Sequence, residues 1–181
     1  MTFYQALLNE VDEMRERLSA RYARHLVCRP GCSSCCRHNL TVFEAEAEAI
    51  RAALHELPPD ARERISLQAS EVRGREQRGE PVSCPILVDD RCAIYHSRPV
   101  ICRTQGLPLL YVAEDGQQEV DFCPLNFTAP NAVDDLEEAH LVPLDALNQK
   151  LVKVNIEHCS HNALTPSAGA RSSMSTIILS R

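Results

Sequence analysis

The chain has 181 residues, of which 44% are hydrophobic and 24% are charged, so it is long enough to bury a core of its own. Acidic residues outnumber Lys and Arg by 25 to 19, and the net charge of −6 excludes a strongly basic nucleic-acid-binding surface. The first residues lack the pattern of a secretory signal, and no apolar run reaches bilayer length. We therefore expect a cytoplasmic protein, monomer or homodimer, with an unknown protein partner and without nucleic-acid or membrane binding.

Residues 2–26 carry the pattern of one amphipathic helix. Thr2 and Gln5 have the spacing of a capping box at its start. Apolar residues then recur at helical spacing, at Phe3, Leu7, Val11, Met14, Leu18 and Tyr22. This stripe predicts a helix that packs on the core, and a dimerisation or partner helix is the alternative.

Two further helices are predicted before residue 80. Thr41 and Glu44 have capping-box spacing, so the second helix starts there, and it runs to about Leu57. Its apolar side carries Ala49, Ile50, Ala53, Leu54 and Leu57. A third helix over residues 60–77 has only a narrow apolar stripe of Ile65, Ala69 and Val72, which predicts that most of its surface is exposed.

From Val82 the pattern changes to short strands and turns. Hairpins are predicted across Asp89-Asp90 and across Asp115-Gly116, with a short helical segment around Cys102 between them. Residues 126–135 are predicted as a loop. A last helix follows with Asp145 as its cap, and Thr176–Leu179 is predicted as an edge strand or as disordered chain.

These elements predict an α+β fold, with several helices packed around a small, irregular cysteine-rich lobe that contains short β-hairpins. The expected organisation is a single domain over residues 1–181. Its parts are an N-terminal helix (1–26), a cysteine-cluster metal-binding region (27–125) and a C-terminal helix and tail (126–181).

Nine cysteines are the most informative feature of the sequence, and four of them fall within residues 28–36. Thiols separated by two or three residues around Pro30 and Gly31 can turn several sulfurs inward, as a soft metal or an iron–sulfur cluster requires. A disulfide framework is the alternative, but it needs an oxidising compartment and fits an odd cysteine count poorly. The predicted metal ligands are Cys28, Cys32, Cys35, Cys36, Cys84, Cys92, Cys102 and Cys123.

The adjacent pair Cys35 and Cys36 limits the geometry, because side chains at neighbouring positions usually point apart. The pair predicts two neighbouring centres or one polynuclear cluster. Eight thiols are enough for two four-thiolate sites, and one site with four spectator thiols is the alternative. Arg98 and Arg103 flank Cys102 and are expected to offset thiolate charge, whereas Cys159 is expected to be an ordinary buried thiol.

Together, the cluster Cys28–Cys36 and the run from Cys84 through Cys92-Ala-Ile-Tyr95 and Arg98-Pro99 to Cys102 resemble the bacterial cysteine-cluster family named for its CxxCxxCC signature. The resemblance covers about residues 26–125. In this chain the first gap has three residues, Cys28-x3-Cys32, where the family has two. The resemblance implies a zinc- or iron-chelating domain, and it transfers a metal site without a reaction.

Three functions are compatible with such a site. An iron–sulfur cluster would support electron transfer or sensing. Zinc in closed thiolate sites would instead support a protein-interaction module without catalytic activity. An enzyme is the third class, but the sequence contains no nucleophile–base pair, no phosphate-binding Gly-rich loop and no histidine-rich open site, so no catalytic residues are predicted.

Overall fold

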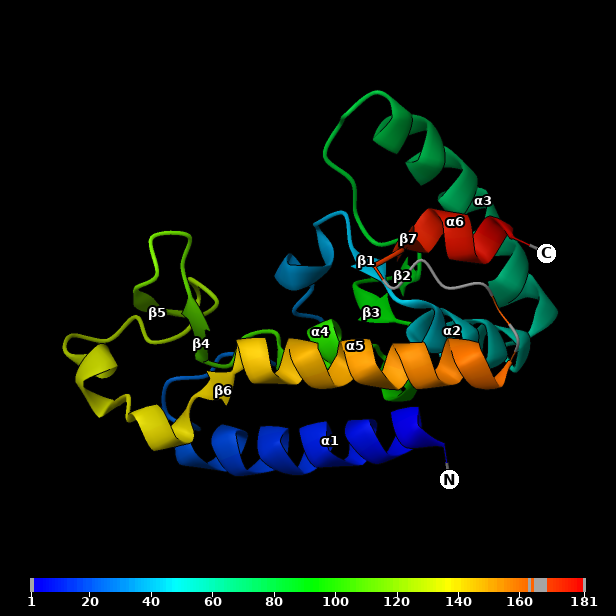
Figure 1. Ribbon diagram of the computed structural model, residues 1–181. Helices are drawn as coiled ribbons and strands as arrows, with labels where there is room; N and C mark the ends of the chain where they lie inside the picture. The colour runs from blue at the N-terminus through cyan, green and yellow to red at the C-terminus, as the bar shows by residue number, and fades with distance from the viewer. Residues whose placement is uncertain (1, 163, 165–168, 181) are drawn as a thin grey trace. The chain divides into compact units, whose positions relative to one another are not determined.

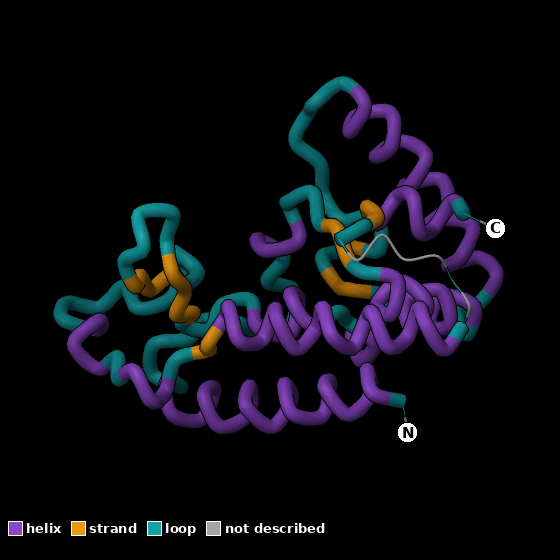
Figure 2. The backbone as a smooth tube through the Cα atoms, in the orientation of Figure 1, coloured by secondary structure: helices purple, strands orange, loops and turns teal. Residues whose placement is uncertain are grey.

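The computed structural model describes residues 2–162, 164 and 169–180. In this part of the chain six α-helices and seven short strands form an α+β fold, which confirms the predicted class. Figure 2 shows the strands as short segments between longer stretches of helix and loop. The chain divides into two units. The first contains the chain up to Arg29 together with Val100–Val154, and the second contains Pro30–Pro99 together with the residues from Asn155 onward. No helix among the described residues combines the length and apolar character of a membrane span.

Helix α1 (Phe3–Arg21) begins the first unit. Thr2 Oγ1 accepts a hydrogen bond from the Gln5 amide at 3.1 Å, which confirms Thr2 as the cap. The helix ends at Arg21 rather than near residue 26, and a turn follows in which the Leu26 amide donates to the Tyr22 carbonyl. The buried residues of α1 and its cap are Tyr4, Leu7, Leu8, Val11, Leu18 and Tyr22.

The predicted stripe of α1 was wrong at its first position. Phe3 is 69% exposed, whereas Tyr4 is buried. Tyr4 lies three and four residues before Leu7 and Leu8, so it neighbours both on the helix surface, whereas Phe3 neighbours Leu7 alone and lies at the edge of this face.

The rest of the first unit contains a three-stranded sheet. Its elements are α4 (Val100–Thr104), β4 (Leu109–Val112), β5 (Gln118–Asp121), η3 (Ala132–Asp135), η4 (Glu138–His140), β6 (Val142–Pro143) and the first part of α5 (Leu144–His161). The strand order is β5-β4-β6, in which β4 pairs antiparallel with β5 and parallel with β6. The predicted second hairpin is therefore confirmed. The 3-10 turn η3 lies at the end of the segment that was predicted as a loop.

Asp145 was predicted to cap the last helix, and the structure shows it in a different contact. It lies in the first turn of α5, and its carboxylate accepts a hydrogen bond from the Val112 amide at 2.8 Å. This contact joins the start of α5 to the end of β4. Farther along α5, Lys150 forms an ion pair with Glu10 of α1 at 2.8 Å.

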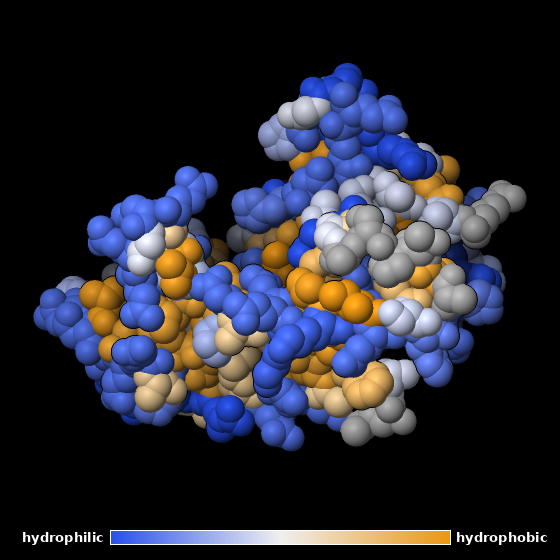
Figure 3. All heavy atoms as spheres, in the orientation of Figure 1, coloured by the Kyte–Doolittle hydropathy of each residue, from blue (hydrophilic) through white to orange (hydrophobic). Residues whose placement is uncertain are grey.

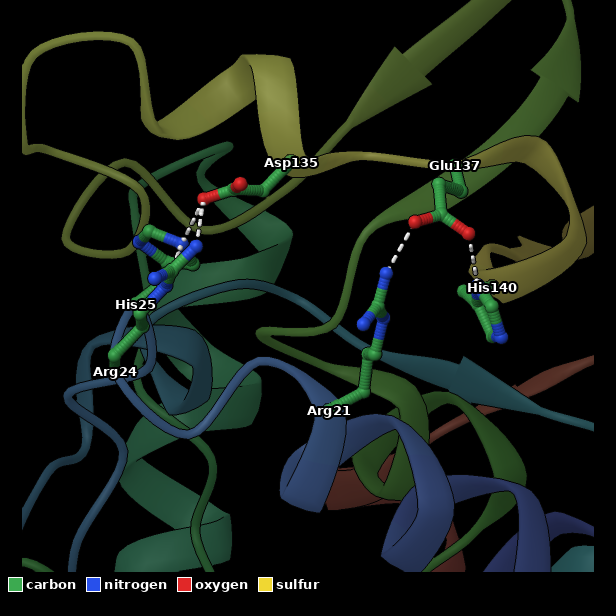
Figure 4. Close-up of polar contacts among 6 residues, drawn as sticks. All are labelled: Arg21, Arg24, His25, Asp135, Glu137 and His140. Carbon is green, nitrogen blue, oxygen red and sulfur yellow. Dashed lines mark hydrogen bonds and ion pairs between the residues drawn. The ribbon is translucent and has the colours of Figure 1, made fainter.

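Two groups of ion pairs fasten the segment 132–141 to the end of α1 (Figure 4). In one group Glu137 contacts both Arg21 and His140. In the other, Asp135 Oδ2 lies 2.7 Å from His25 Nε2 and 2.6 Å from Arg24 Nη2. The hydrogen bond to His25, followed by the one to Arg24, holds the pKa of Asp135 below its usual range.

Among its described residues, the second unit contains three α-helices and two small antiparallel sheets, along with the last turns of α5. Its elements are η1 (Ser34–Cys36), β1 (Thr41–Val42), α2 (Glu44–His55), α3 (Pro59–Gln77), β2 (Leu87–Val88), β3 (Arg91–Cys92), η2 (Tyr95–Ser97), β7 (Ser172–Ser173) and α6 (Met174–Leu179). The strand pairs are β1 with β7 and β2 with β3. Helix α6 lies beside α3 (Figure 1).

The second unit corrects two sequence predictions. Thr176–Leu179 is helical, within α6, and Ser173 Oγ accepts from the Thr176 amide at 3.3 Å as its cap. Thr41 does not cap α2, because it pairs with Ser173 in the β1–β7 sheet. Instead the Phe43 amide donates to Glu46 Oε2 at 3.0 Å at the start of α2.

Helix α6 explains how the narrow stripe of α3 becomes buried. Ile65 and Ala69 of α3 are 1% and 0% exposed, and Ile177 of α6 is 2% exposed. Glu76, near the end of α3, accepts hydrogen bonds from the hydroxyls of Ser173 and Ser175, at 3.3 and 2.5 Å. An apolar contact and a polar contact therefore join the two helices.

Gly106, two residues after α4, occupies a site that has no room for a side chain. Its φ is +91°, and a Cβ there would lie 2.8 Å from Cys28 Sγ and 3.3 Å from Asn126 Nδ2. The Asn126 side chain, 1% exposed, donates to the Gly106 carbonyl at 2.7 Å and accepts from the Val27 amide at 2.9 Å. Gly106 thus allows Cys28 and Asn126 to approach the backbone closely.

We expect Gly106→Ala to destabilise the first unit more than Gly116→Ala. Gly116 has a similar φ of +84° but has no atom within 4 Å of its Cβ position. Left-handed backbone strain should cost about 1–2 kcal/mol in both variants, and overlap with Cys28 and Asn126 should add about 1–3 kcal/mol at Gly106 alone. Urea unfolding of both variants measures the difference, and equal losses would contradict the close approach.

Candidate metal centre

Residues 31–36 form a turn that presents two adjacent thiols. Gly31 has a φ of +91°, a conformation that glycine adopts without strain, and the chain then enters the 3-10 turn η1. Ser33 is the N-cap residue of η1, and its carbonyl accepts from the Cys36 amide at 2.9 Å. We refer to residues 31–36 as the knuckle.

The second cysteine segment is the predicted hairpin, which the structure confirms. Leu87 pairs with Cys92 and Val88 with Arg91, so only Asp89 and Asp90 form the turn. Both residues have positive φ, 50° and 57°, as a two-residue type I′ turn requires. The register places Cys92 on the strand that returns from the turn.

Three contacts hold the knuckle and the hairpin segment together. The Cys84 amide donates to the Cys36 carbonyl at 2.7 Å. The Ser33 hydroxyl donates to Asp90 Oδ1 at 2.6 Å, and Arg37 lies 3.6 Å from the same oxygen. Two cysteine segments separated by about fifty residues of sequence therefore meet within the second unit.

Cys35 lies within electrostatic range of the thiols of Cys36, Cys84 and Cys92. A hydrogen bond with Cys36, followed by burial, raises the pKa of the Cys35 thiol. Burial, together with the charges of Cys92 and Cys35, raises the pKa of Cys84 to about 11. Burial also raises the pKa of Cys92, to which Cys35 contributes in turn. We call Cys35, Cys36, Cys84 and Cys92 the four-thiol cluster.

Cys36 raises the pKa of the adjacent Cys35 thiol, so the two side chains interact although neighbouring side chains usually point apart. The two arrangements expected for this pair, two neighbouring centres or one polynuclear cluster, both stay predictions.

Arg98 supplies positive charge to the four-thiol cluster. Its guanidinium acts to lower the pKa of Cys35 and Cys92, opposite to the net effect of their surroundings. The guanidinium lies 3.7 Å from the ring centroid of Tyr95, and Nε donates to the Tyr95 carbonyl at 3.0 Å. Tyr95 is 49% exposed, so it is a surface residue rather than part of the core.

Arg103 is 7% exposed and pairs with Asp12 of α1, so its charge contributes to the packing of α4 against α1 in the first unit. Its expected role beside Cys102 stays a prediction. Cys159, at 3% exposure, is the buried thiol that was expected.

The remaining predicted ligands fall into both units. Cys32 is half-buried at the start of the knuckle. Cys28, Cys102 and Cys123 belong to the first unit, where the Asn126 amide donates to the Cys123 carbonyl at 2.8 Å and Asn126 Nδ2 lies 3.7 Å from Cys28 Sγ. All nine cysteines are among the described residues, and none forms a disulfide.

The chemistry of the four-thiol cluster fits a soft metal. Partly buried thiols with raised pKa values are poor anions by themselves, and a bound cation with high thiolate affinity supplies the missing charge. Zinc and iron–sulfur clusters are both held by four thiolates. Among the residues that the structure describes, no three His, Cys, Asp or Glu side chains already stand in the geometry of a metal site.

Sequence reasoning missed the residues that organise the thiols. Asp90 was read only as a turn residue, and Ser33 and Asn126 were not singled out. One signal was available for Asp90, because an Asp-Asp pair stands where an Asp-Gly pair would fit the turn better. Asn126 carries no comparable signal, since its role depends on a long-range approach to Cys28.

Comparison with known protein families identifies the family of this chain. A family model matches residues 27–124, more than half of the chain, and its description is "CxxCxxCC: Putative zinc- or iron-chelating domain". The matched range contains the whole four-thiol cluster together with the other four predicted ligands. No curated protein and no solved structure matches the chain. The chain belongs to the CxxCxxCC family of zinc- or iron-chelating domains.

Proposed function

We propose that this protein binds metal in its second unit, through Cys35, Cys36, Cys84 and Cys92. The bound metal would be an iron–sulfur cluster or zinc. The observation that carries the proposal is the hydrogen bond from the Cys84 amide to the Cys36 carbonyl at 2.7 Å, because it joins the two cysteine segments. The raised pKa values of Cys35, Cys84 and Cys92, to which the neighbouring thiols contribute, support it. Cys28, Cys32, Cys102 and Cys123 are proposed as additional ligands.

An iron–sulfur cluster with a role in electron transfer or sensing is the first candidate. Such a cluster supplies one-electron redox chemistry, and its potential depends on net charge, hydrogen bonds to sulfur and solvent exposure. In this chain Arg98 would add positive charge beside two of the thiols, and their partial burial would limit access of water. Both features are properties of the protein itself, so they would influence the potential of a bound cluster regardless of the redox partner.

The second candidate is a zinc-structured protein-interaction module without catalytic activity. It is favoured by a groove of about 1170 Å³ in the first unit, between α1, β4 and the segment 138–143. The apolar side chains of Met14, Leu18, Leu110 and Leu141 line the groove together with Arg17 and other polar residues. Figure 3 shows hydrophobic residues gathered at the surface around β4 and β6. Open grooves lined by apolar side chains are common places for partner segments to bind.

Metal identity separates the two candidates. Protein purified without oxygen should be brown, with broad visible absorption and iron and acid-labile sulfide in equal amounts, if the first candidate is right. Colourless protein that contains stoichiometric zinc would support the second candidate. Protein that retains neither metal, even after reconstitution with each, would contradict the proposal as a whole.

Single Ser variants test the ligand assignment. We expect Cys36→Ser and Cys84→Ser to lose bound metal, because a protonated hydroxyl replaces a soft thiolate in each. Cys159→Ser is the matched control, since this thiol is buried and lies apart from the four-thiol cluster in sequence. Metal analysis of the purified variants provides the measurement. Full metal content in Cys84→Ser, or loss of metal in Cys159→Ser, would refute the assignment.

A further inference from the structure

The turn of the β2–β3 hairpin is strained at two consecutive positions. Asp89 and Asp90 have φ values of 50° and 57°, in the left-handed region that non-glycine residues disfavour. Asn-Gly and Asp-Gly are the pairs that fit such a turn best, because glycine removes the steric cost at the second position. A side chain at position 90 therefore costs backbone energy, and strain of this kind is often found where a side chain has a function.

The Asp90 side chain joins the two thiol segments. Its Oδ1 accepts from the hydroxyl of Ser33, a residue that is only 7% exposed, at 2.6 Å. Ser33 is the N-cap residue of the turn that carries Cys35 and Cys36, and Asp90 itself stands two residues before Cys92. One carboxylate thus fixes the knuckle against the strand that bears the opposing thiol.

Asp89 is the other residue of this turn, and it provides a comparison because its side chain does not contact the knuckle. Its side chain is 88% exposed, and its ion pair is with Arg64 at 3.6 Å. Exposed ion pairs at such a distance contribute little to stability. The two aspartates share the backbone conformation, and only Asp90 reaches the knuckle.

We propose that Asp90 is a positioning residue of the metal centre, which sets the separation between Cys35 and Cys36 on the knuckle and Cys92 on the hairpin. The inference rests on the proposed function of the four-thiol cluster. A charge-assisted hydrogen bond to a buried hydroxyl is short and directional, so it can hold the two segments in register before metal binds. Preorganised ligands bind metal more tightly because less ordering remains to be done.

Two alternative roles for Asp90 predict that its replacement does not weaken metal binding. If Asp90 served only to form the turn, then Asp90→Gly would improve the turn and leave metal affinity unchanged or higher. If its negative charge were the main effect, removal would favour ionisation of the neighbouring thiols and strengthen metal binding. The positioning role predicts weaker metal binding in a variant whose metal-free fold is no less stable.

The experiment compares Asp90→Gly with Asp89→Gly in the full chain. Co²⁺ serves as the probe, with affinity measured from thiolate-to-metal absorption in competition with a chelator, and thermal unfolding is measured without metal. We expect Asp90→Gly to bind Co²⁺ about 10–100-fold more weakly, as removal of outer contacts to metal ligands generally does. Asp89→Gly should stay within about twofold of wild type, because it loses only an exposed ion pair. Asp90→Asn, which keeps an acceptor oxygen, should recover most of the lost affinity.

Each outcome either supports or overturns the inference. Unchanged Co²⁺ affinity in Asp90→Gly overturns it, as does an equal loss in Asp89→Gly, which would assign the effect to the backbone of the turn. A lower unfolding temperature of metal-free Asp90→Gly that accounts for the whole loss of affinity also overturns it. If wild-type protein binds no Co²⁺, the proposed function itself fails, and the inference fails with it.

Discussion

The hydrogen bond from the Cys84 amide to the Cys36 carbonyl is the contact on which the candidate metal centre depends. It joins a knuckle that follows Gly31 to a hairpin segment about fifty residues later, and helices α2 and α3 form most of the chain between them. Those helices are held by buried apolar contacts, including those of Ile50 and Ile65. The segment of Cys84 and Cys92 adds the buried side chains of Ile86 and Ile94, so apolar packing sets where the cysteine segments meet. A few polar contacts then set how closely they approach.

The approach of the two cysteine segments explains why the four thiols suit a soft metal. It also explains why neither segment alone is sufficient to form the proposed site. Burial raises the pKa of Cys84 and Cys92, and contact with Cys36 raises the pKa of Cys35, so the metal-free cluster carries thiols more readily than thiolates. A soft cation reverses this preference, because it compensates the charge of several sulfurs at once. Arg98, stacked on an exposed Tyr95, contributes further positive charge from outside the cluster. Metal binding and local order are thus expected to be coupled.

Local signals in the sequence predicted most of the elements, and the failures have physical causes. The third helix and both hairpins were predicted because periodicity and turn residues act over a few positions. Thr41 and Thr176–Leu179 were misassigned because β1 pairs with β7 and α6 packs on α3, and both contacts depend on the distant end of the chain. The eight ligands were selected by residue type and by their spacing along the chain. The subset that lies together was beyond prediction, because it depends on how Cys84 approaches Cys36.

Differential alkylation with mass mapping tests the central claim most directly, because it identifies the protected thiols without any substitution. The metal-bound protein and the chelator-treated protein are labelled under the same conditions, and the labelled cysteines are compared. The account predicts that Cys35, Cys36, Cys84 and Cys92 are protected only when metal is bound, while Cys159 is protected in both states by burial. Labelling of these four thiols at the same rate in both states would contradict it.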